Sequence, residues 1–250
     1  MAAGRRSMAR GDFEAGAAAF RRAATNAPQD ARIWMALGHA ELAAERYVRA
    51  REAFSRAARL RPRAARPRIL VGNTWELSRR YDEALRAYRR AVSVAPASAH
   101  AQRYLGTRLL RWGRVEAAIA PLARSVELEP DHAETWNALG LARQQAGRED
   151  EAIATFRRAS RRHPEHLGLR VGLGASLINA GRLQAALSVY ERLLERWPSF
   201  APAHVGRGIL LHELGREDDA EAAFVRAVEV DGGGRYRARL EAYRRIRRRD

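Results

Sequence analysis

The sequence contains no cysteine and no lysine, and these two absences exclude several classes of functional site. Without cysteine the chain forms neither disulfides nor thiolate metal centres, and the redox state of its compartment stays open. Without lysine it holds no Schiff-base lysine and no phosphate-loop lysine, so pyridoxal enzymes and P-loop NTPases are excluded. All 46 basic residues are therefore arginines, and the formal net charge is +17.

Long apolar runs are also absent from the 250 residues. A membrane-spanning helix needs about 20 consecutive apolar residues, so we expect no membrane span. The segment before Phe20 carries basic residues but lacks the continuous apolar stretch of a secretory signal. We therefore expect a cytoplasmic protein.

The chain shows no catalytic motif. It has no nucleophile elbow, no HExxH pair and no GxGxxG loop, so we expect no enzymatic activity and no cofactor. His163 and His166 flank Pro164 without cysteines or convergent carboxylates nearby. We interpret them as solvated loop histidines and expect no metal site.

A period of 34 residues organises most of the sequence. Trp136 follows Trp34 by 102 residues, which is three times 34, and the sequences around the two tryptophans are similar. Six units fit without insertion, at 31–64, 65–98, 99–132, 133–166, 167–200 and 201–234. The eighth position is always glycine, at Gly38, Gly72, Gly106, Gly140, Gly174 and Gly208. The twentieth is always alanine, at Ala50, Ala84, Ala118, Ala152, Ala186 and Ala220. Such regularity predicts a repeat architecture, with a partial unit at 1–30.

Each unit has the pattern of two antiparallel helices. Within 133–166, Gly147 is placed to end the first helix in a left-handed conformation, and Pro164 follows the second helix. Asp131 and Glu134 have the spacing of a capping box for the first helix. The small residues at positions 8 and 20 allow close helix crossing beside an aromatic ring, Phe156, at position 24. Each pair then has an apolar face that only a neighbouring pair can cover.

The series Trp136, Leu139, Gly140, Ala152, Phe156, Ala159 and Pro164 resembles the tetratricopeptide repeat signature over about residues 11–234. The resemblance implies an all-α, right-handed superhelical solenoid whose first helices line a concave groove. Residues 235–250, with Tyr236, Leu240 and Tyr243 on one face and many arginines elsewhere, are expected to form a capping helix. The partial unit at 1–30 has no comparable cap and offers a face for self-association.

The resemblance places positions 2, 5, 9, 12 and 13 of each unit in the groove. The candidate binding residues are Met35, His39, Ile69, Asn73, His100, Arg103, Thr107, Arg111, Asn137, Leu141, Gln144, Gln145, Val171, Ile178, Asn179, Val205 and Ile209. Amides and arginines at these positions can hydrogen-bond an extended backbone or its carboxylates, and the apolar residues can accept anchor side chains. We therefore expect an unidentified protein or peptide partner, with acidic groups opposite the arginines.

Three functions remain open from the sequence. The leading hypothesis is a non-catalytic scaffold that binds a protein segment in the groove. An alternative is the targeting region of a larger enzyme, because similar arrays are joined to sulfotransferases and glycosyltransferases. The third is electrostatic nucleic-acid binding through the arginines of position 26, namely Arg22, Arg56, Arg90, Arg124, Arg158, Arg192 and Arg226. We rank it last because no aromatic stacking platform accompanies these arginines.

Overall fold

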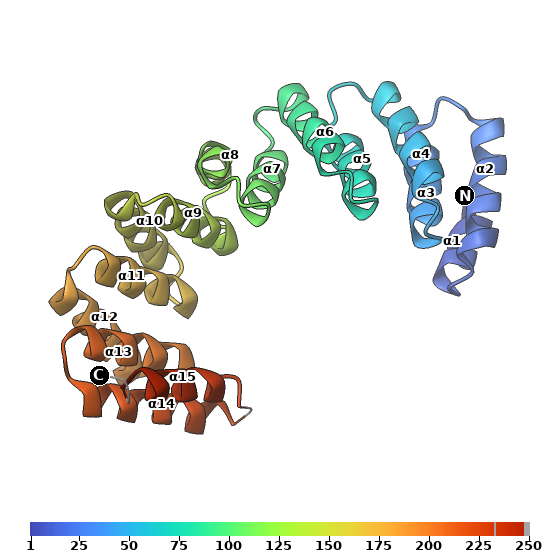
Figure 1. Cartoon of the computed structure of the whole chain (residues 1–250). Helices are drawn as coiled ribbons and strands as arrows, with labels where there is room; N and C mark the ends of the chain where they lie inside the picture. Colours follow the sequence, from blue (N-terminus) through green and yellow to red (C-terminus); the bar gives the residue numbers. More distant parts are fainter. Residues whose placement is uncertain (233, 248–250) are drawn as a thin grey trace. The chain divides into compact units, whose positions relative to one another are not determined.

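The computed structural model describes residues 1–232 and 234–247, and within these ranges it contains fifteen α-helices and no strand (Figure 1). The helices are α1 (Ala2–Ala9), α2 (Phe13–Asn26), α3 (Ala31–Ala43), α4 (Tyr47–Leu60), α5 (Ala65–Leu77), α6 (Tyr81–Val94), α7 (Ala99–Arg111), α8 (Val115–Leu128), α9 (Ala133–Gln145), α10 (Glu149–Arg162), α11 (Leu167–Asn179), α12 (Leu183–Arg196), α13 (Ala201–Glu213), α14 (Glu217–Asp231) and α15 (Arg237–Arg247). The predicted all-α class of paired helices is confirmed.

The chain divides into two compact units, Met1–Leu109 and Leu110–Asp250. In the first unit each helix packs against the next along the chain, from the α1–α2 pair to the α5–α6 pair. The second unit continues in the same way from α8–α9 to α14–α15, and α11 also contacts α9 and α13. The boundary between the units falls inside α7, in the third full repeat.

The turn between the two helices has a residue in the left-handed conformation at the same position of each of the six repeats. At the end of α9, Gly147 has φ 70°, and the N–H of Arg148 donates to the Arg143 carbonyl at 2.9 Å, which closes the helix end. Two repeats without glycine here keep the left-handed conformation, with φ 56° at Glu45 and 58° at Arg79. The predicted left-handed glycine is confirmed, also at Gly113, Gly181 and Gly215.

The glycine at position 8 gives the aromatic ring its place in the core. A Cβ atom on Gly140 would lie within 3.0 Å of the Phe156 ring, and one on Gly172 of the next helix pair would meet the same ring. The ring is 0% exposed between them. Equivalent buried side chains are Phe54, Tyr88, Leu122, Tyr190 and Phe224. The Phe156 ring thereby packs against the first helix of its own repeat, as the pattern of small and large residues predicted, and against the first helix of the next repeat, as the Tyr190 ring also does.

The fourth residue of each repeat donates a side-chain hydrogen bond to the preceding turn. The Trp136 indole N–H reaches the Pro130 carbonyl oxygen at 2.7 Å. Other side chains make the same bond to the corresponding proline, namely Trp34, Gln102, Arg170 and His204. Arg68 instead donates to the carbonyl of Ala64 at 2.8 Å. The sequence varies at this position, but every residue there supplies an N–H donor.

The predicted capping box at the start of α9 is wrong. The helix begins at Ala133 with His132 as its N-cap residue, and the His132 side chain makes no capping hydrogen bond. Asp131 lies one residue too early, and its carboxylate accepts from Arg162 Nε at 2.8 Å. Glu134 lies 3.1 Å from the His132 ring. These carboxylates therefore make side-chain pairs instead of capping the helix.

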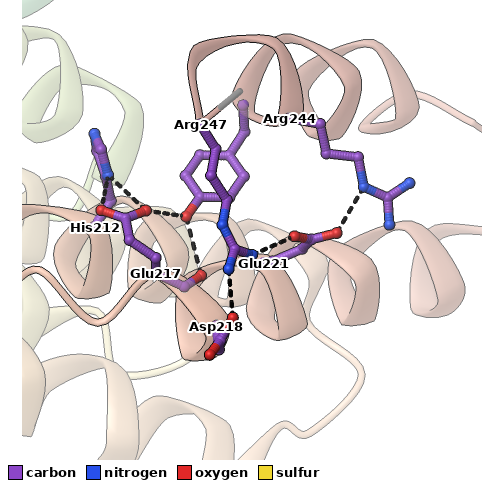
Figure 2. Close-up of polar contacts among 7 residues, drawn as sticks. His212, Glu217, Asp218, Glu221, Arg244 and Arg247 are labelled. Carbon is purple, nitrogen blue, oxygen red and sulfur yellow. Dashed lines mark hydrogen bonds and ion pairs between the residues drawn. The ribbon is translucent and has the colours of Figure 1, made fainter. Parts of the chain in front are cut away.

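Helix α15 covers the apolar face of α14. Leu240 and Tyr243 are buried and belong to one hydrophobic cluster with Phe224. The Tyr243 hydroxyl donates to the main-chain carbonyl of Glu217 at 3.0 Å and to the Glu217 carboxylate (Figure 2). Burial and the bond to this carboxylate raise the pKa of Tyr243 to about 12. The expected cap extended to residue 250, and its last three residues lie outside the described part of the chain.

Ion pairs between arginines of α15 and carboxylates of α14 also hold α15 in place (Figure 2). Arg244 Nε lies 2.7 Å from Glu221, and Arg247 pairs with both Glu221 and Asp218. These contacts lower the pKa of Glu221, mainly through the hydrogen bond from Arg244. Part of the arginine excess in this segment thus serves to dock the helix.

Candidate binding surfaces

A pocket of about 370 Å³ lies between α3 and α5 in the first unit. Met35 and His39, one helical turn apart on α3, line it together with Pro67 of α5. Its remaining walls are Ala31, Arg32, Ala36, Arg61, Ala64 and Arg66. Two predicted groove residues therefore share one concavity, and basic side chains surround them.

The arginines of this pocket differ in whether they pair with a carboxylate. The Arg32 side chain donates hydrogen bonds to the Asp30 carboxylate from Nε at 3.0 Å and from Nη2 at 2.8 Å. These bonds, together with the backbone N–H of Arg32, lower the pKa of Asp30 to about 2. Among the described residues, neither Arg61 nor Arg66 has a carboxylate partner within salt-bridge distance. The pocket thus has three arginines and one nearby carboxylate, that of Asp30, which pairs with Arg32 and is also stabilised by the charge of Arg61.

The surroundings of His39 at the pocket wall favour the neutral imidazole. Burial lowers its pKa, and the positive charge of Arg66 lowers it further. Its ring meets Phe54 edge-on, with centroids 5.2 Å apart. A neutral imidazole carries one donor and one acceptor nitrogen, so it can pair with a carbonyl or an N–H group of a ligand.

The other predicted groove residues of the first unit are engaged within the protein. The Asn73 side-chain oxygen accepts from the Tyr88 hydroxyl at 2.8 Å. The Thr107 hydroxyl donates to the main-chain carbonyl of Arg103 at 2.9 Å, and Arg103 Nη2 lies 3.2 Å from His100 Nδ1. Of these, His100 is exposed and the rest are partly buried.

The expected accessibility of Ile69 and Val205 is wrong. Ile69 is 2% exposed and Val205 is 6% exposed, so both side chains pack in the interior. Position 5 of a repeat faces the groove only where the neighbouring helices leave it open, and at these two places they cover it. Neither residue offers surface to a ligand in this conformation.

The candidates of the second unit differ in how exposed they are. Arg111, Gln145 and Asn179 are exposed, and Asn179 Nδ2 donates to Glu149 at 3.2 Å. The half-buried candidates are Asn137, Leu141, Gln144, Val171, Ile178 and Ile209. They supply mixed polar and apolar surface on the first helices of their repeats.

Sequence reasoning missed a partly buried polar network on α5, α6 and α7. Glu76 accepts from the Tyr88 hydroxyl and from Arg108 Nε, each at 2.8 Å. Burial raises the pKa of Tyr88 well above its ordinary value, and Glu76 adds to the shift. Glu76 and Arg108 stand at positions 12 and 10 of successive repeats. This 32-residue offset was the signal available in the sequence.

The arginines of position 26 are mostly exposed, and several have local partners. Arg124 pairs with Glu127 at 2.8 Å, and Arg226 pairs with Glu229 at 2.9 Å. No group of three or more His, Asp or Glu side chains in the described residues is arranged to hold a metal ion. No helix among these residues is long and apolar enough to cross a membrane.

Comparisons with known proteins agree on the type of repeat. A family model described as tetratricopeptide repeat matches residues 1–65, 78–133, 106–166, 137–198 and 171–236. A comparison with curated proteins found no match.

Solved structures with the same fold share little sequence with this chain. A repeat-containing protein from Cytophaga hutchinsonii is 12% identical, with a TM-score of 0.72 over 95% of this chain and 97% of its own. YrrB, described as a tetratricopeptide protein with an unusual peptide-binding site, is 18% identical, with a TM-score of 0.57 over 90% and 99%. MamA is 21% identical, with a TM-score of 0.55 over 65% and 95%.

Proposed function

The chain belongs to the tetratricopeptide repeat family, and from this premise we propose that it is a non-catalytic scaffold that binds an acidic segment of a partner protein. Arrays of this family serve protein–protein interaction in general. The single observation that supports a specific site is the pocket between α3 and α5, which combines apolar walls with Arg61 and Arg66, neither of which has a carboxylate within salt-bridge distance among the described residues.

The lining of this pocket matches an extended peptide that carries carboxylates. Arg61 and Arg66 can each make paired N–H···O bonds to a carboxylate, a stronger contact than a neutral hydrogen bond. Met35 and Pro67 provide apolar surface for an adjacent side chain. Met35 is unbranched and adapts to different shapes. His39 can bond to the peptide backbone.

Arg32 limits what the pocket can bind. Its guanidinium already pairs with Asp30, so an incoming carboxylate gains little from it. Asp30 also repels an acidic ligand near Arg32 and offsets part of the charge of Arg61, whereas Arg66 has no such carboxylate among the described residues. We therefore place the carboxylate of the ligand towards Arg61 and Arg66, at the α5 side of the pocket.

In the second unit, Arg111, Asn137, Gln144 and Gln145 are proposed as a separate contact surface for polar segments of a partner. Their amide and guanidinium groups suit backbone carbonyls and carboxylates. YrrB is described as having a peptide-binding site, which supports this class of ligand for the fold without identifying the partner.

Affinity capture from a nuclease-treated extract of the source organism tests the proposal. The intact chain is compared with Arg61→Glu/Arg66→Glu and with a control of equal charge change, Arg5→Glu/Arg10→Glu, on exposed positions near α1. We expect a discrete protein that the intact chain and the control retain and the pocket variant loses. Equal retention by all three would contradict the site, and circular dichroism checks that each variant is folded.

A further inference from the structure

A second pocket, of about 540 Å³, lies in the other unit between α10 and α12, with α11 as its floor. Its apolar lining comes from Leu173 of α11 and Val189 of α12, which are partly exposed, and from Leu177 and Leu193, which are each only 1% exposed. Arginines stand around it, namely Arg157, Arg170, Arg192 and Arg196. No residue of the α3–α5 pocket contributes to it.

The residue at position 4 explains why this pocket is open. In the preceding repeat the corresponding residue is Trp136, whose indole is 3% exposed. Here Arg170 takes its place and still donates to the proline carbonyl of the turn, that of Pro164. Its guanidinium lies 5.3 Å from the centroid of Trp197. Arg170, which lacks the bulk of an indole ring, thus keeps the hydrogen bond to the turn and leaves apolar surface on α11 uncovered.

The same substitution occurs in the first unit, where Arg68 stands at position 4. A pocket of about 390 Å³ lies there at the corresponding place, between α4 and α6, and Val71 lines it at the position that Leu173 occupies in the second unit. The agreement of two repeats supports the link between an arginine at position 4 and an open apolar floor.

The charge around the larger pocket is not balanced by the protein. Among the described residues, Arg157 and Arg192 have no carboxylate within salt-bridge distance, and Arg192 Nε bonds only to the Ser188 carbonyl at 3.1 Å. Arg196 has Glu165 at 3.6 Å. Arg157 also borders a wider basic hollow along α10 with Arg158, Arg161 and Arg162. An anion at the rim therefore meets several guanidinium groups, and its apolar part can cover the floor.

We propose that this pocket binds an organic anion with an apolar body, of the class of medium-chain alkyl carboxylates. Pockets of roughly 300–1,000 Å³ with apolar walls and a few charged groups are typical of small-molecule sites. Guanidinium groups suit carboxylate geometry, and burial of the alkyl chain adds a favourable contribution for each methylene removed from water. This site is independent of the proposed protein-binding pocket in the first unit.

The experiment is calorimetric titration of the intact chain with decanoate at moderate salt. Two probes separate the contributions: decyltrimethylammonium has the same alkyl chain with the opposite charge, and acetate has the charge without the chain. We expect one decanoate per chain and at least about tenfold weaker binding of both control probes. Equal binding of either control probe, or no decanoate binding, would overturn the proposal.

Two variants place the binding in the pocket. Arg170→Trp restores the residue found at Trp136, keeps an N–H donor for the turn and fills the pocket, so it should remain folded and lose decanoate at least about tenfold. Arg157→Gln/Arg192→Gln removes the rim charge and should weaken binding similarly. Arg22→Gln, at the repeat position of Arg192 but on α2, is the control and should bind as the intact chain does.

Other outcomes are equally decisive. Decanoate binding that survives both pocket variants would place it elsewhere and overturn the assignment. An acidic peptide that binds with the same sensitivity to Arg170→Trp, while decanoate does not bind, would assign the pocket to a partner protein and reject the small-molecule ligand.

Discussion

Replacing Gly140 with alanine should destabilise the protein, although alanine is the better helix former. The new methyl group would enter the space of the Phe156 ring, which is fully buried. Gly172, in the next helix pair, packs against the same ring, so the ring has little room to shift. Two opposing effects must therefore be compared.

Overpacking a filled interior costs about 1–3 kcal/mol. Exchanging glycine for alanine inside a helix stabilises by about 1 kcal/mol. Because Phe156 is confined by two glycines, we expect the overpacking cost at the upper end of its range and a net loss of about 1–2 kcal/mol in the free energy of unfolding. Urea denaturation followed by circular dichroism measures the difference.

Two further variants test the reasoning. Gly168→Ala lies in α11, where a Cβ atom would meet only the His166 side chain, at 3.3 Å, so it should be neutral or slightly stabilising. In a Phe156→Leu background, which imitates Leu122 at the same repeat position, Gly140→Ala should cost less than in the intact chain. If Gly140→Ala stabilises the protein as alanine normally does in helices, the packing argument is refuted.

Glu45→Gly should stabilise the protein by about 0.5–1 kcal/mol because its left-handed conformation disfavours a side chain. Gly147→Ala should destabilise by about 1 kcal/mol, although no atom would contact the methyl group, and thermal unfolding measures both effects. The pKa of Tyr243 is raised in the folded state, so its contribution to stability should be complete below about pH 10 and lost as pH rises towards 12; Tyr243→Phe should remove this loss in unfolding experiments across that range. The lowered pKa of Asp30 should contribute stability above about pH 4 that is lost as pH falls towards 2, and an NMR titration of Arg32→Gln should show a raised Asp30 pKa that stays below its ordinary value, because the backbone N–H of residue 32 and the charge of Arg61 remain.

The helix pairs were predictable from the sequence because each repeat position carries one physical requirement. Position 15 needs a left-handed backbone, and position 8 needs a residue without a side chain beside a ring. These requirements recur every 34 residues and are visible without coordinates. The bond donated by position 4 was hidden, because Trp136, Gln102 and His204 look unrelated until their common acceptor is seen.

The candidate site was predictable only in part. Met35 and His39 do line a pocket, since their spacing places them on one side of α3. Ile69 has the same repeat position as Met35 but is buried, because burial depends on the size and approach of neighbouring side chains. Similarly, the oxygen of Asn73 is engaged by Tyr88, a contact that repeat position alone does not specify. The repeat pattern therefore predicts on which side of a helix a residue lies, whereas the packing of neighbouring side chains determines whether that residue is accessible.

Site-specific photocrosslinking from position 35 tests the interaction-scaffold account most directly. A photoreactive phenylalanine derivative replaces Met35 in the chain expressed in its source organism, with the same replacement at exposed Arg49 of α4 as the control. The account predicts a discrete adduct from position 35, on an acidic segment of one protein, that disappears when Arg66→Glu is added. No adduct from position 35, or the same adduct from both positions, would contradict it.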